Sequence, residues 1–529
     1  MAIDSHNPDY ALEDGAAEVV DLCAAVLSRR PMILVSNRGP VEHQMPDAPP
    51  QAQGASAGAV RVRPEPRRGS GSIVTAFSSL AQNHPFTWVS SAMSEGDRQV
   101  SAGSAGVSVK SPVSGHSINL RYVVTPRRAY HKYYNVICNP LLWFLQHYLW
   151  NPPYNPTVDA SIHDAWETGY VPVNEAFARG VVAEARALNS GSADPAPLVM
   201  AHDYHLYLLP ELVRRDLPEA LIQHYVHIPW PTPLYWSMIP RYIVRRICES
   251  LCMADIVGFQ TPQDRRSFFD TVEEFVPEAQ VGRIAEVVEL EGHLCNVKVY
   301  PASINVEEVQ RIANTPRTLE YEARLQAEAG EFTIVRVDRA EPTKNIIRGF
   351  RAYDLMLSQH PELKGRVKLL AFLVPSRTHI RQYQRYLEEV KQSINQVNGN
   401  HGSDRWQPIV PFIENNYAQA VAGMKLYDAL LVNTLVEGTN PVAQEGPVVN
   451  HRDGVLVLSQ SSGAYRQLAE GALTVAPADI EGTAQTLYHA LVMPANERNR
   501  RAGVLYNAVR RHDNNDWLHR QFRDIAALL

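Results

Sequence analysis

Short apolar segments alternate with amphipathic helical stretches along most of the chain, and this alternation restricts the fold more than any other feature of the sequence. Several segments are apolar at nearly every position, which is typical of strands covered by helices on both faces. Strands are predicted at 32–35, 87–90, 198–201, 223–227 and 256–259, and again at 333–337, 367–373, 409–412, 429–432, 455–458 and 473–475. Crossover helices are predicted at 206–215, 346–357 and 383–397. The pattern predicts βαβ units and an α/β fold with parallel sheets.

A chain of 529 residues is longer than one hydrophobic core usually organises, so more than one domain is expected. The strand pattern restarts after Tyr300-Pro301, which places the predicted boundary near residue 305. We predict an N-terminal extension (1–30), a first doubly wound domain (31–305), a second (306–505) and a C-terminal helical segment (506–529) able to pack back on the first domain. Within the first domain, segment 44–68 is rich in Pro, Ala, Gly, Gln and Arg and is predicted to be a mobile loop.

The overall charge excludes some classes of partner. The formal net charge is -6, so the chain has no basic field for wrapping nucleic acid or docking on an anionic membrane. No apolar run approaches the roughly 20 residues that span a bilayer. The five cysteines are few and scattered, and the N-terminus is acidic without an apolar signal segment. These features predict a cytoplasmic protein that holds any anionic ligand through local arginines and lysines.

Polar residues follow several predicted strands directly. In doubly wound domains ligands bind at the carboxyl ends of the strands, and a pair of such domains binds them in the cleft between. The residues in question are Ser36–Pro40, Gly69–Ser72, His202–His205, His227–Pro231, Arg339 with Lys344, 375–377, and Glu437–Asn440 followed by Glu445. Arginine forks, lysine charges and glycine amides at a helix start all suit phosphate. The set predicts anion binding together with sugar recognition, although each motif alone is weakly specific.

Four histidines, at positions 202, 205, 224 and 227, raise the alternative of a zinc site. A zinc site needs converging ligands, usually with a carboxylate or thiolate among them. His224 and His227 lie three apart on a predicted strand and would point to opposite faces. The spacing therefore argues against a shared metal and favours a core role for His224.

Taken together and in order, these motifs resemble those of the trehalose-6-phosphate synthase family of retaining glycosyltransferases. That family has the GT-B fold, in which two Rossmann-like doubly wound domains face a central cleft. The resemblance runs from about Pro31 to the region of Val492 and keeps spacing as well as residue type. It implies a first domain that binds the acceptor and a second that binds the nucleotide-sugar.

The activity implied by the resemblance is transfer of glucose from UDP-, GDP- or ADP-glucose to glucose 6-phosphate, giving trehalose 6-phosphate. The configuration of the sugar is retained through a front-face substitution. The resemblance implies no covalent enzyme intermediate, no essential metal and no cofactor. The family often assembles as dimers or tetramers, so a homo-oligomer is compatible with it.

The resemblance assigns roles to residues of the first domain. The residues implied to contact the acceptor are Arg38 (at its phosphate), Tyr134, Trp143 and Asp203. The glycine-rich turn implies that Gly71 lies beside the donor phosphates. The His-Ile-Pro motif implies that His227 contacts the donor sugar and helps align the reacting bond.

In the second domain, the resemblance implies that Arg339 and Lys344 clamp the donor diphosphate and that Arg377 is a second ligand of the acceptor phosphate. The family motif Asp-Gly-Met-Asn-Leu-Val-x-x-Glu corresponds here to residues that would bind the donor, namely Glu437, Gly438, Thr439, Asn440, Val442 and Glu445. Glu445 would hold the ribose hydroxyls. The residues implied to take part in catalysis are Asp203, His227, Arg339 and Lys344.

Three positions depart from the family pattern. Glu437 replaces an aspartate that contacts the donor sugar, and Ser72 stands where leucine is common. A tryptophan of the acceptor pocket corresponds to Val89, with Trp88 one position early, and such a displacement on a strand turns the ring to the other face. These departures, and Tyr235-Trp236 after the His-Ile-Pro-Trp-Pro segment, resemble the pseudo-glycosyltransferase branch that makes validoxylamine 7'-phosphate.

The acceptor therefore stays open among three phosphorylated compounds. They are glucose 6-phosphate, which Tyr134 and Trp143 favour, an aminocyclitol 7-phosphate, and glycerol 3-phosphate. A non-catalytic sugar-phosphate sensor is an alternative of another class. The retained Arg339, Lys344 and Glu445 argue against a sensor, because sensing the acceptor alone needs no clamp for the donor.

Overall fold

The computed structural model describes residues 22–45, 64–69, 72–78, 80–102, 107–110, 117–149, 157–188 and 196–529. It separates into two compact units. Unit 1 comprises Met1–Leu145, Pro156–Tyr300 and His519–Leu529, and unit 2 comprises Gln146–Asn155 and Pro301–Leu518. Gly71, most of the predicted loop 44–68 and most of the predicted extension 1–30 lie outside the described residues.

Unit 1 is built on a ten-stranded sheet in the order β10-β11-β12-β9-β8-β7-β1-β4-β6-β5. The run from β12 to β6 pairs in parallel, and β5, β10 and β11 pair antiparallel at the two ends. The strands are β1 (Met32–Val35), β4 (Thr87–Ser91), β5 (Val107–Lys110), β6 (Ser117–Val123), β7 (Leu198–His202), β8 (Leu221–Tyr225), β9 (Ile256–Phe259), β10 (Gln280–Gly282), β11 (Val287–Leu290) and β12 (His293–Val299).

One strand boundary differs from the sequence prediction in a way that matters for the site. Strand β8 ends at Tyr225, so His227 lies two residues beyond it and is not a strand residue. The expectation that His224 and His227 point to opposite faces of one strand was wrong for this reason. A loop residue is not bound by the two-residue alternation of a strand.

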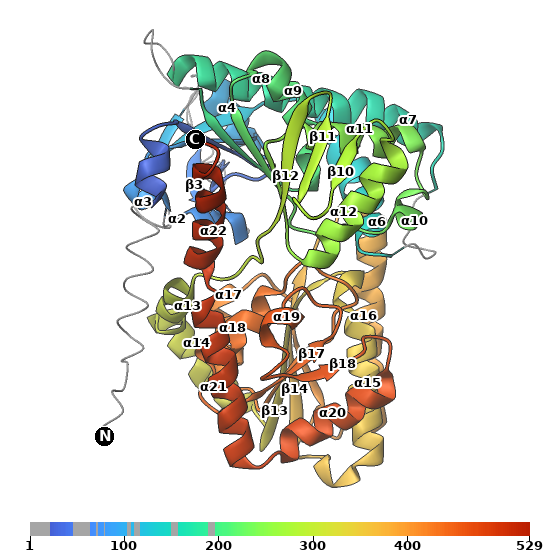
Figure 1. Ribbon diagram of the computed structural model, residues 1–529. Helices are drawn as coiled ribbons and strands as arrows, with labels where there is room; N and C mark the ends of the chain where they lie inside the picture. Colours follow the sequence, from blue (N-terminus) through green and yellow to red (C-terminus); the bar gives the residue numbers. More distant parts are fainter. Residues whose placement is uncertain are drawn as a thin grey trace, which may run out of the picture. The chain divides into compact units, whose positions relative to one another are not determined.

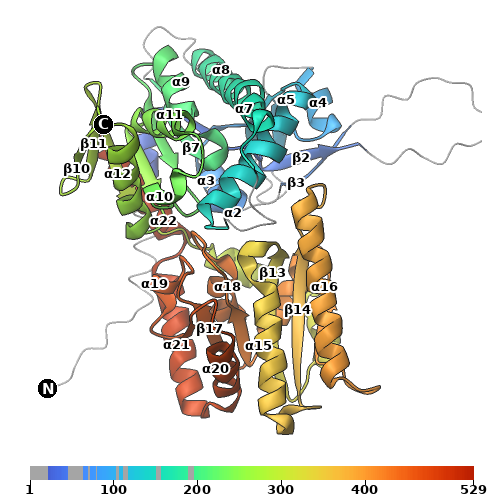
Figure 2. The same ribbon diagram turned by 90° about the vertical axis from the view of Figure 1, so that its right-hand side faces the viewer.

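Helices cover the sheet of unit 1 on both sides (Figures 1 and 2). The longest, α8, packs on β1, β4 and β6, and α12 packs on β9 and β12. The helices are α2 (Ser72–Ser78), α3 (Leu80–Asn83), α4 (Glu95–Ala102), α5 (Arg127–His131), η1 (Lys132–Leu142), α6 (Trp143–Gln146), α7 (Ala160–Ala165), η2 (Trp166–Tyr170), α8 (Val171–Leu188), η3 (Tyr204–Leu206), α9 (Leu209–Asp216), α10 (Pro233–Trp236), α11 (Arg241–Cys252) and α12 (Pro262–Phe275). On α11, Cys248 and Cys252 are fully buried and lie one turn apart on the same face of the helix.

The C-terminal helix α22 (Asn514–Ala526) returns to unit 1 at the end of the chain. The amide of Gln223 on β8 donates to Gln521 over 2.9 Å, and the hydroxyl of Tyr300 donates to Asp524 over 2.8 Å. Phe522 and Ile525 of this helix are fully buried. The last helix therefore completes the packing of a sheet whose strands lie before residue 300.

A two-stranded hairpin stands apart from the main sheet. Strand β2 (Val41–Gln44) pairs antiparallel with β3 (Glu65–Arg68), so both ends of the segment predicted as a loop are strand residues. Buried His43 fixes this hairpin: its backbone N–H donates to Asp97 over 2.8 Å, and its Nδ1 lies 3.0 Å from the hydroxyl of Tyr122. Strand β3 consists of one proline and three charged residues, so it has none of the apolar character on which the strand prediction relied.

Unit 2 contains a six-stranded parallel sheet in the order β15-β14-β13-β16-β17-β18. Its strands are β13 (Phe332–Ala340), β14 (Val367–Pro375), β15 (Ile409–Phe412), β16 (Ala429–Val432), β17 (Val455–Ser459) and β18 (Leu473–Val475). Its helices are α13 (Val306–Ala313), α14 (Pro316–Glu328), η4 (Pro342–Lys344), α15 (Ile346–Gln359), η5 (Pro361–Leu363), α16 (Arg381–His401), α17 (Tyr417–Lys425), α18 (Pro441–Val449), α19 (Tyr465–Leu468), α20 (Ile480–Val492) and α21 (Ala495–Arg511).

Successive residues of these strands enter two separate cores. Ile334 and Leu431 pack with α15, α16 and α20, whereas Val335 and Leu430 pack with α13, α17, α18 and α21. Figure 2 shows α15 and α16 lying along the sheet on the first of these sides. A sheet buried on both faces needs apolar residues at consecutive positions, which explains the near-continuous apolar runs of the sequence. The predicted α/β class, with two doubly wound Rossmann-like units, is confirmed.

No helix of the described residues is long and apolar enough to cross a membrane.

Candidate active site

Asp203 and His227 come together because β7 and β8 are neighbours in the sheet of unit 1. Asp203 follows β7 with φ 76° and ψ 170°, a backbone conformation that residues with a side chain rarely adopt. Its N–H donates to the carbonyl of Tyr225 over 2.8 Å, which holds this conformation. The backbone N–H of His227 in turn donates to Oδ1 of Asp203 over 3.3 Å. The two strand ends thus fix both predicted catalytic residues of unit 1.

The imidazole of His227 lies against two other aromatic side chains. Its Nε2 lies 3.0 Å from Nδ1 of His202, and the ring of Tyr225 packs edge-on at 4.6 Å between centroids. Burial lowers the pKa of His227 to about 3, and that of His224 to about 3 as well. His227 is therefore neutral near pH 7. Its ring is a hydrogen-bonding group and not a cation under these conditions.

The histidines do not form a metal centre with their neighbours. Within the part of the chain that the structure describes, no group of three or more His, Cys, Asp or Glu side chains is placed to hold a metal ion. His224 instead packs beside the ring of Tyr207, at 5.7 Å between centroids, inside the core. His205 stacks on Tyr134, and the rings of His202 and His227 face each other.

Tyr134 is the centre of an aromatic stack. Its ring is nearly parallel to Tyr130, at 5.7 Å and 9°, and to His205, at 5.9 Å and 14°. The guanidinium of Arg38, on the exposed loop after β1, donates from Nη2 to the Tyr134 hydroxyl over 3.1 Å. His205 also approaches the carboxylate of Asp203, at 3.9 Å. Arg38, Tyr134, Asp203, His205 and His227 are called the unit 1 cluster below.

Trp143 and the Trp88–Val89 pair complete the residues predicted for the acceptor. The Trp143 ring lies 5.7 Å from that of Tyr204, which adjoins His205. Trp88 is buried and donates from Nε1 to the hydroxyl of Ser36 over 2.8 Å. Val89 is fully buried on the same strand, β4, which packs against α8. Trp88 thus contacts Ser36, the first residue of the Ser-Asn-Arg motif that ends at Arg38.

In unit 2, Lys344 forms a buried ion pair with Glu437. Lys344 ends the short helix η4 after β13, and Glu437 follows β16, the strand next to β13. The other oxygen of Glu437 accepts from Nδ2 of Asn440 over 2.7 Å. Burial opposes the charge on Lys344, but the carboxylates of Glu437, Asp338 and Glu341 outweigh it and raise the pKa of Lys344. Lys344 therefore stays a cation, and Glu437 is its counter-charge.

Arg336 binds the backbone of this lysine, and the sequence analysis missed it. It is fully buried on β13 and makes two hydrogen bonds to Asp338 Oδ2, at 2.7 and 2.9 Å. It also donates to the carbonyl of Lys344 over 3.2 Å. A side chain at Gly349 would collide with it, because a Cβ there would lie 2.3 Å from Nη1 of Arg336. An arginine inside an apolar strand was the available signal, since buried charges are almost always paired.

Glu341 is a second residue that the sequence reasoning missed. It is 1% exposed and accepts hydrogen bonds from Arg377 over 2.9 Å, Ser376 over 3.2 Å and Thr343 over 3.2 Å. Burial alone would raise its pKa, but Arg339, Arg377 and Lys344 lower the pKa of Glu341 to about 2. One carboxylate thus ties the turn after β13 to the turn after β14.

Arg377 is oriented by its surroundings. Its backbone has φ 45°, in the left-handed region, and its guanidinium lies 5.1 Å from the centroid of the Tyr383 ring. Arg339, by contrast, is exposed at the end of β13. Arg336, Glu341, Lys344, Arg377 and Glu437 are called the unit 2 cluster below.

The remaining predicted donor residues lie at the start of α18. Asn440 caps the helix by accepting from the N–H of Ala443 over 3.2 Å, and Thr439 donates to the carbonyl of Ala302 over 3.4 Å. Gly438 is packed against Gly463, where an added Cβ would lie 1.5 Å from its carbonyl oxygen. Val442 is half-buried. One turn further on, burial raises the pKa of Glu445 to about 7, against a hydrogen bond from Tyr417 that lowers it.

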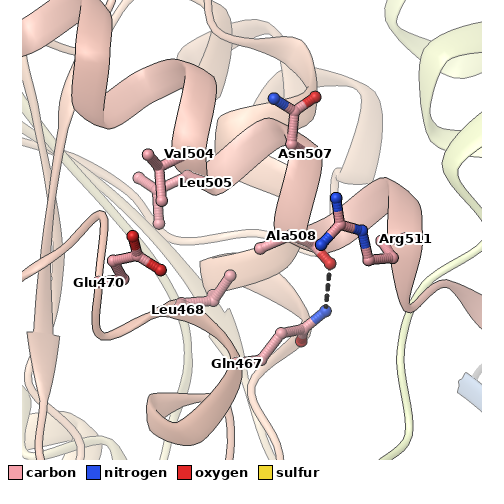
Figure 3. Close-up of a pocket in the computed structure, with 8 residues that line it drawn as sticks. All are labelled: Gln467, Leu468, Glu470, Val504, Leu505, Asn507, Ala508 and Arg511. Atoms are coloured by element: carbon pink, nitrogen blue, oxygen red, sulfur yellow. Dashed lines mark hydrogen bonds between the residues drawn. The ribbon is translucent and has the colours of Figure 1, made fainter. Parts of the chain in front are cut away.

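A small pocket elsewhere in unit 2 is not lined by any of these residues. It has a volume of about 230 Å³ and lies against α19 and α21, where Gln467 donates to the carbonyl of Ala508 over 3.2 Å (Figure 3). Its other side chains include Glu470, Asn507 and Arg511.

Comparison with known proteins identifies the family. The sequence pattern of glycosyltransferase family 20 matches residues 32–527, nearly the whole chain. The chain belongs to glycosyltransferase family 20. This confirms the resemblance found in the motifs and makes the protein a glycosyltransferase homologous to the trehalose-phosphate synthases.

Two curated relatives and one crystal structure show how far the similarity extends. A bifunctional trehalose-6-phosphate synthase/phosphatase of Thermoproteus tenax is 34% identical over 356 residues, which is 66% of this chain but 46% of that longer protein. A validamine 7-phosphate valienyltransferase of Streptomyces hygroscopicus subsp. jinggangensis is 27% identical over 87% of this chain and 88% of its own. A UDP-forming alpha,alpha-trehalose-phosphate synthase from Burkholderia xenovorans, solved in complex with glucose-6-phosphate, superposes with a TM-score of 0.75 at 24% identity, over 94% of this chain and 100% of its own. The last of these shows that the family 20 chain has the GT-B fold.

Proposed function

We propose that this family 20 glycosyltransferase transfers glucose from a nucleotide-glucose donor to glucose 6-phosphate, with retention of configuration, giving trehalose 6-phosphate. The observation that carries the proposal is the Arg38–Tyr134 hydrogen bond in unit 1. It presents an exposed guanidinium on an aromatic stack, a combination suited to a phosphate attached to a sugar ring. The 34% identical relative, which is named a trehalose-6-phosphate synthase/phosphatase, supports the same product.

On the donor side, Lys344 of the unit 2 cluster and the nearby Arg339 supply the positive charge that the reaction needs. As the bond between the sugar carbon and the diphosphate oxygen breaks, negative charge grows on the leaving group. Lys344 and Arg339, with the backbone amides near Gly438, stabilise that charge. Because Lys344 is already ordered by Glu437, little reorganisation accompanies the reaction.

On the acceptor side, Arg38 and Arg377 bind the phosphate remote from the reacting hydroxyl, and this binding supplies orientation. Asp203 holds the acceptor sugar and neutral His227 hydrogen-bonds the donor sugar. The acceptor oxygen forms the new bond to the sugar carbon, and its proton passes to the departing phosphate oxygen. No separate general base is required, and the proposal requires both clusters to act on the same donor and acceptor.

The second candidate is transfer to an aminocyclitol 7-phosphate. Two observations favour it: the similarity to a validamine 7-phosphate valienyltransferase over 88% of that protein, and Glu437 in place of the family's aspartate. The Glu437 carboxylate is shared by Lys344 and Asn440, so its longer arm is used inside the protein. This changes which groups remain to hold the sugar of the donor.

A matrix of donors against acceptors tests the proposal. UDP-, GDP- and ADP-glucose are each combined with glucose 6-phosphate, validamine 7-phosphate and glycerol 3-phosphate. Nucleotide release is measured and the products are identified by mass spectrometry and NMR. We expect release with glucose 6-phosphate and an α,α-linked product.

Three results would reject it. Product formed only with validamine 7-phosphate supports the second candidate, and product formed only with glycerol 3-phosphate assigns a third acceptor. Binding of donor and acceptor by calorimetry, without any nucleotide release, identifies a sensor. Lys344→Ala serves as the inactive control for release.

A further inference from the structure

His202 is the last residue of β7, and the proposed mechanism gives it no role. Its side chain is 1% exposed. The ring of Phe77 packs edge-on against it at 5.3 Å between centroids, and the ring of Tyr225 lies at 6.1 Å. Burial between these rings holds the imidazole of His202 in one position inside unit 1.

The imidazole of His202 faces that of His227. Nδ1 of His202 lies 3.0 Å from Nε2 of His227, which is hydrogen-bond distance for two nitrogens. Burial lowers the pKa of His202 well below its usual value, with the neighbouring His227 and His224 adding to the effect. Burial also keeps His227 neutral. Each ring therefore has one N–H donor and one bare nitrogen, and the contact uses a donor of one ring and an acceptor of the other.

This contact couples the tautomer of His227 to that of His202 and restricts the orientation of the His227 ring. Once Nε2 is either the donor or the acceptor in the bond, the other nitrogen of the ring takes the opposite role. The ring orientation is also set, by His202 on one side, by the edge-on ring of Tyr225 on another, and by the backbone N–H that donates to Asp203. His227 lies beyond the end of β8, so pairing between strands does not fix the orientation of its side chain.

We propose that His202 is a positioning residue that holds the ring of His227 in one orientation and one neutral tautomer, so that Nδ1 of His227 meets the donor sugar. The inference deepens the proposed function and rests on it for the ligand of Nδ1. The state of the His227 ring, however, is a property of the protein and is measured without substrate. An imidazole with a defined tautomer presents the same hydrogen-bonding group to every substrate molecule.

Two amide substitutions of His202 test the proposal as a matched pair. Asparagine places an amide atom where Nδ1 of the imidazole stands, and it can bond to Nε2 of His227 in either direction. Glutamine places its amide near the position of Nε2 instead, while it is also neutral and polar and is closer to histidine in volume. Loss of packing alone would therefore damage His202→Asn more than His202→Gln, whereas loss of the bond to His227 would do the reverse.

The first readout is the pair of ¹⁵N chemical shifts of His227 in protein without substrate, assigned from the signals missing in His227→Gln. We expect one shift of a protonated nitrogen and one of a bare nitrogen in the wild type. In His202→Gln we expect both shifts to move toward the average of the two tautomers. Unchanged shifts in folded His202→Gln would overturn the proposal.

The second readout is steady-state kinetics with the donor and acceptor found active. His202→Gln is expected to lower kcat at least about tenfold, with a smaller change in the KM of the donor, because a misplaced catalytic contact acts mainly in the transition state. His202→Asn is expected to recover most of that loss. Equal kcat in the wild type and His202→Gln, or a larger loss in His202→Asn, contradicts positioning.

The two proposals fail separately. If His202→Gln moves the ¹⁵N shifts but no donor–acceptor pair gives product with the wild type, the positioning of His227 stands and the proposed function falls. If transfer is found and the shifts do not respond, the reverse holds. If His202→Gln does not fold, as judged by circular dichroism, His202→Asn carries the same test. The two ¹⁵N shifts of His227 in His202→Asn must then match those of the wild type, and shifts moved toward the average would overturn the proposal.

Discussion

The two clusters of predicted site residues are built on opposite electrostatic plans. Apart from Arg38 and Asp203, the unit 1 cluster consists of neutral groups: an aromatic stack around Tyr134 and a histidine whose pKa burial lowers to about 3. The unit 2 cluster relies on charges, and each of its buried cations is paired with a carboxylate: Arg336 with Asp338, Lys344 with Glu437 and Arg377 with Glu341. Both arrangements keep polar groups fixed inside the protein, but different changes destabilise them.

The difference follows from what each plan must avoid. A buried cation without a counter-charge is strongly destabilising, so unit 2 buries Lys344 together with the carboxylate of Glu437. Neutral imidazoles and phenols need only hydrogen-bonding partners, so unit 1 can bury several of them in one place. Unit 1 is thereby exposed to protonation, whereas unit 2 is exposed to loss of either member of a pair.

Removing Lys344 should give the largest effect. Lys344→Ala leaves the Glu437 carboxylate buried without its cation, which should lower the free energy of unfolding by about 3–5 kcal/mol. Turnover should fall at least about a hundredfold, as on losing an electrostatic donor in the transition state. Denaturation and nucleotide-release assays measure the two effects. The double variant Lys344→Met with Glu437→Gln should regain stability but not turnover, and near-normal turnover in folded Lys344→Ala would refute the role of the lysine.

Lowering the pH should destabilise unit 1 before unit 2. The buried His224 alone should lower the free energy of unfolding by about 2 kcal/mol between pH 6.5 and pH 5. Its pKa is lowered in the folded state, so between pH 6.5 and pH 5 the unfolded chain binds a proton that the folded chain does not. Stability is therefore lost as pH falls below about 6.5, by about 1.4 kcal/mol per pH unit for one such histidine. Hydrogen exchange at the two pH values, corrected for intrinsic rates, locates the loss. His224→Asn should reduce the slope by that amount, and an unchanged slope would count against it.

Glu445 should show the opposite dependence in unit 2. Burial raises its pKa to about 7, so ionisation at higher pH places a charge where it is poorly solvated. The protonated form fits the fold, and stability is lost as pH rises from about 4.5 through 7. Glu445→Gln should therefore raise the free energy of unfolding by about 3 kcal/mol at pH 8. The difference should vanish near pH 4.5, and stabilisation that persists there would need another cause.

The smallest expected effect concerns the acceptor phosphate. Arg377→Ala should raise the KM of the acceptor about tenfold, the equivalent of about 1.4 kcal/mol, and leave the KM of the donor nearly unchanged. Arg377 is already paired with Glu341, so Arg377→Lys, which keeps the charge but not the planar fork, should give a smaller rise. Equal rises for donor and acceptor would argue against Arg377 as a ligand of the acceptor phosphate.

The sequence predicted the buried strands of both units better than their polar strands and the exact ends of strands. Apolar runs such as those of β9, β15 and β16 coincide with the observed strands, because strands buried on both faces carry a strong compositional signal. The polar hairpin strand β3 and the edge strand β10 carry no such signal and were missed. Likewise β8 ends before His227, since the apolar run does not show where pairing with a neighbouring strand stops.

The site residues were recognised by motif, but their partners were not. Lys344 and Glu437 are far apart in sequence, and they meet because β13 lies beside β16, a strand order that periodicity does not reveal. Glu341 lies between two residues that the motif does include, yet its function is apparent only from the turn that brings Ser376 and Arg377 to it. Local patterns predict elements, whereas the sheet order determines which charges neutralise each other.

The return of α22 to unit 1 has a consequence for biosynthesis. The ribosome completes every strand of the first sheet before residue 300, but the helix that covers Gln223 and Tyr300 is translated only after all of unit 2. A nascent chain must therefore carry an unfinished first domain through some two hundred further residues of elongation, during which buried surface near β8 stays open to chaperones or to misassociation. A released chain truncated before residue 514 and the released full chain would differ most in the protease resistance of the domain made first.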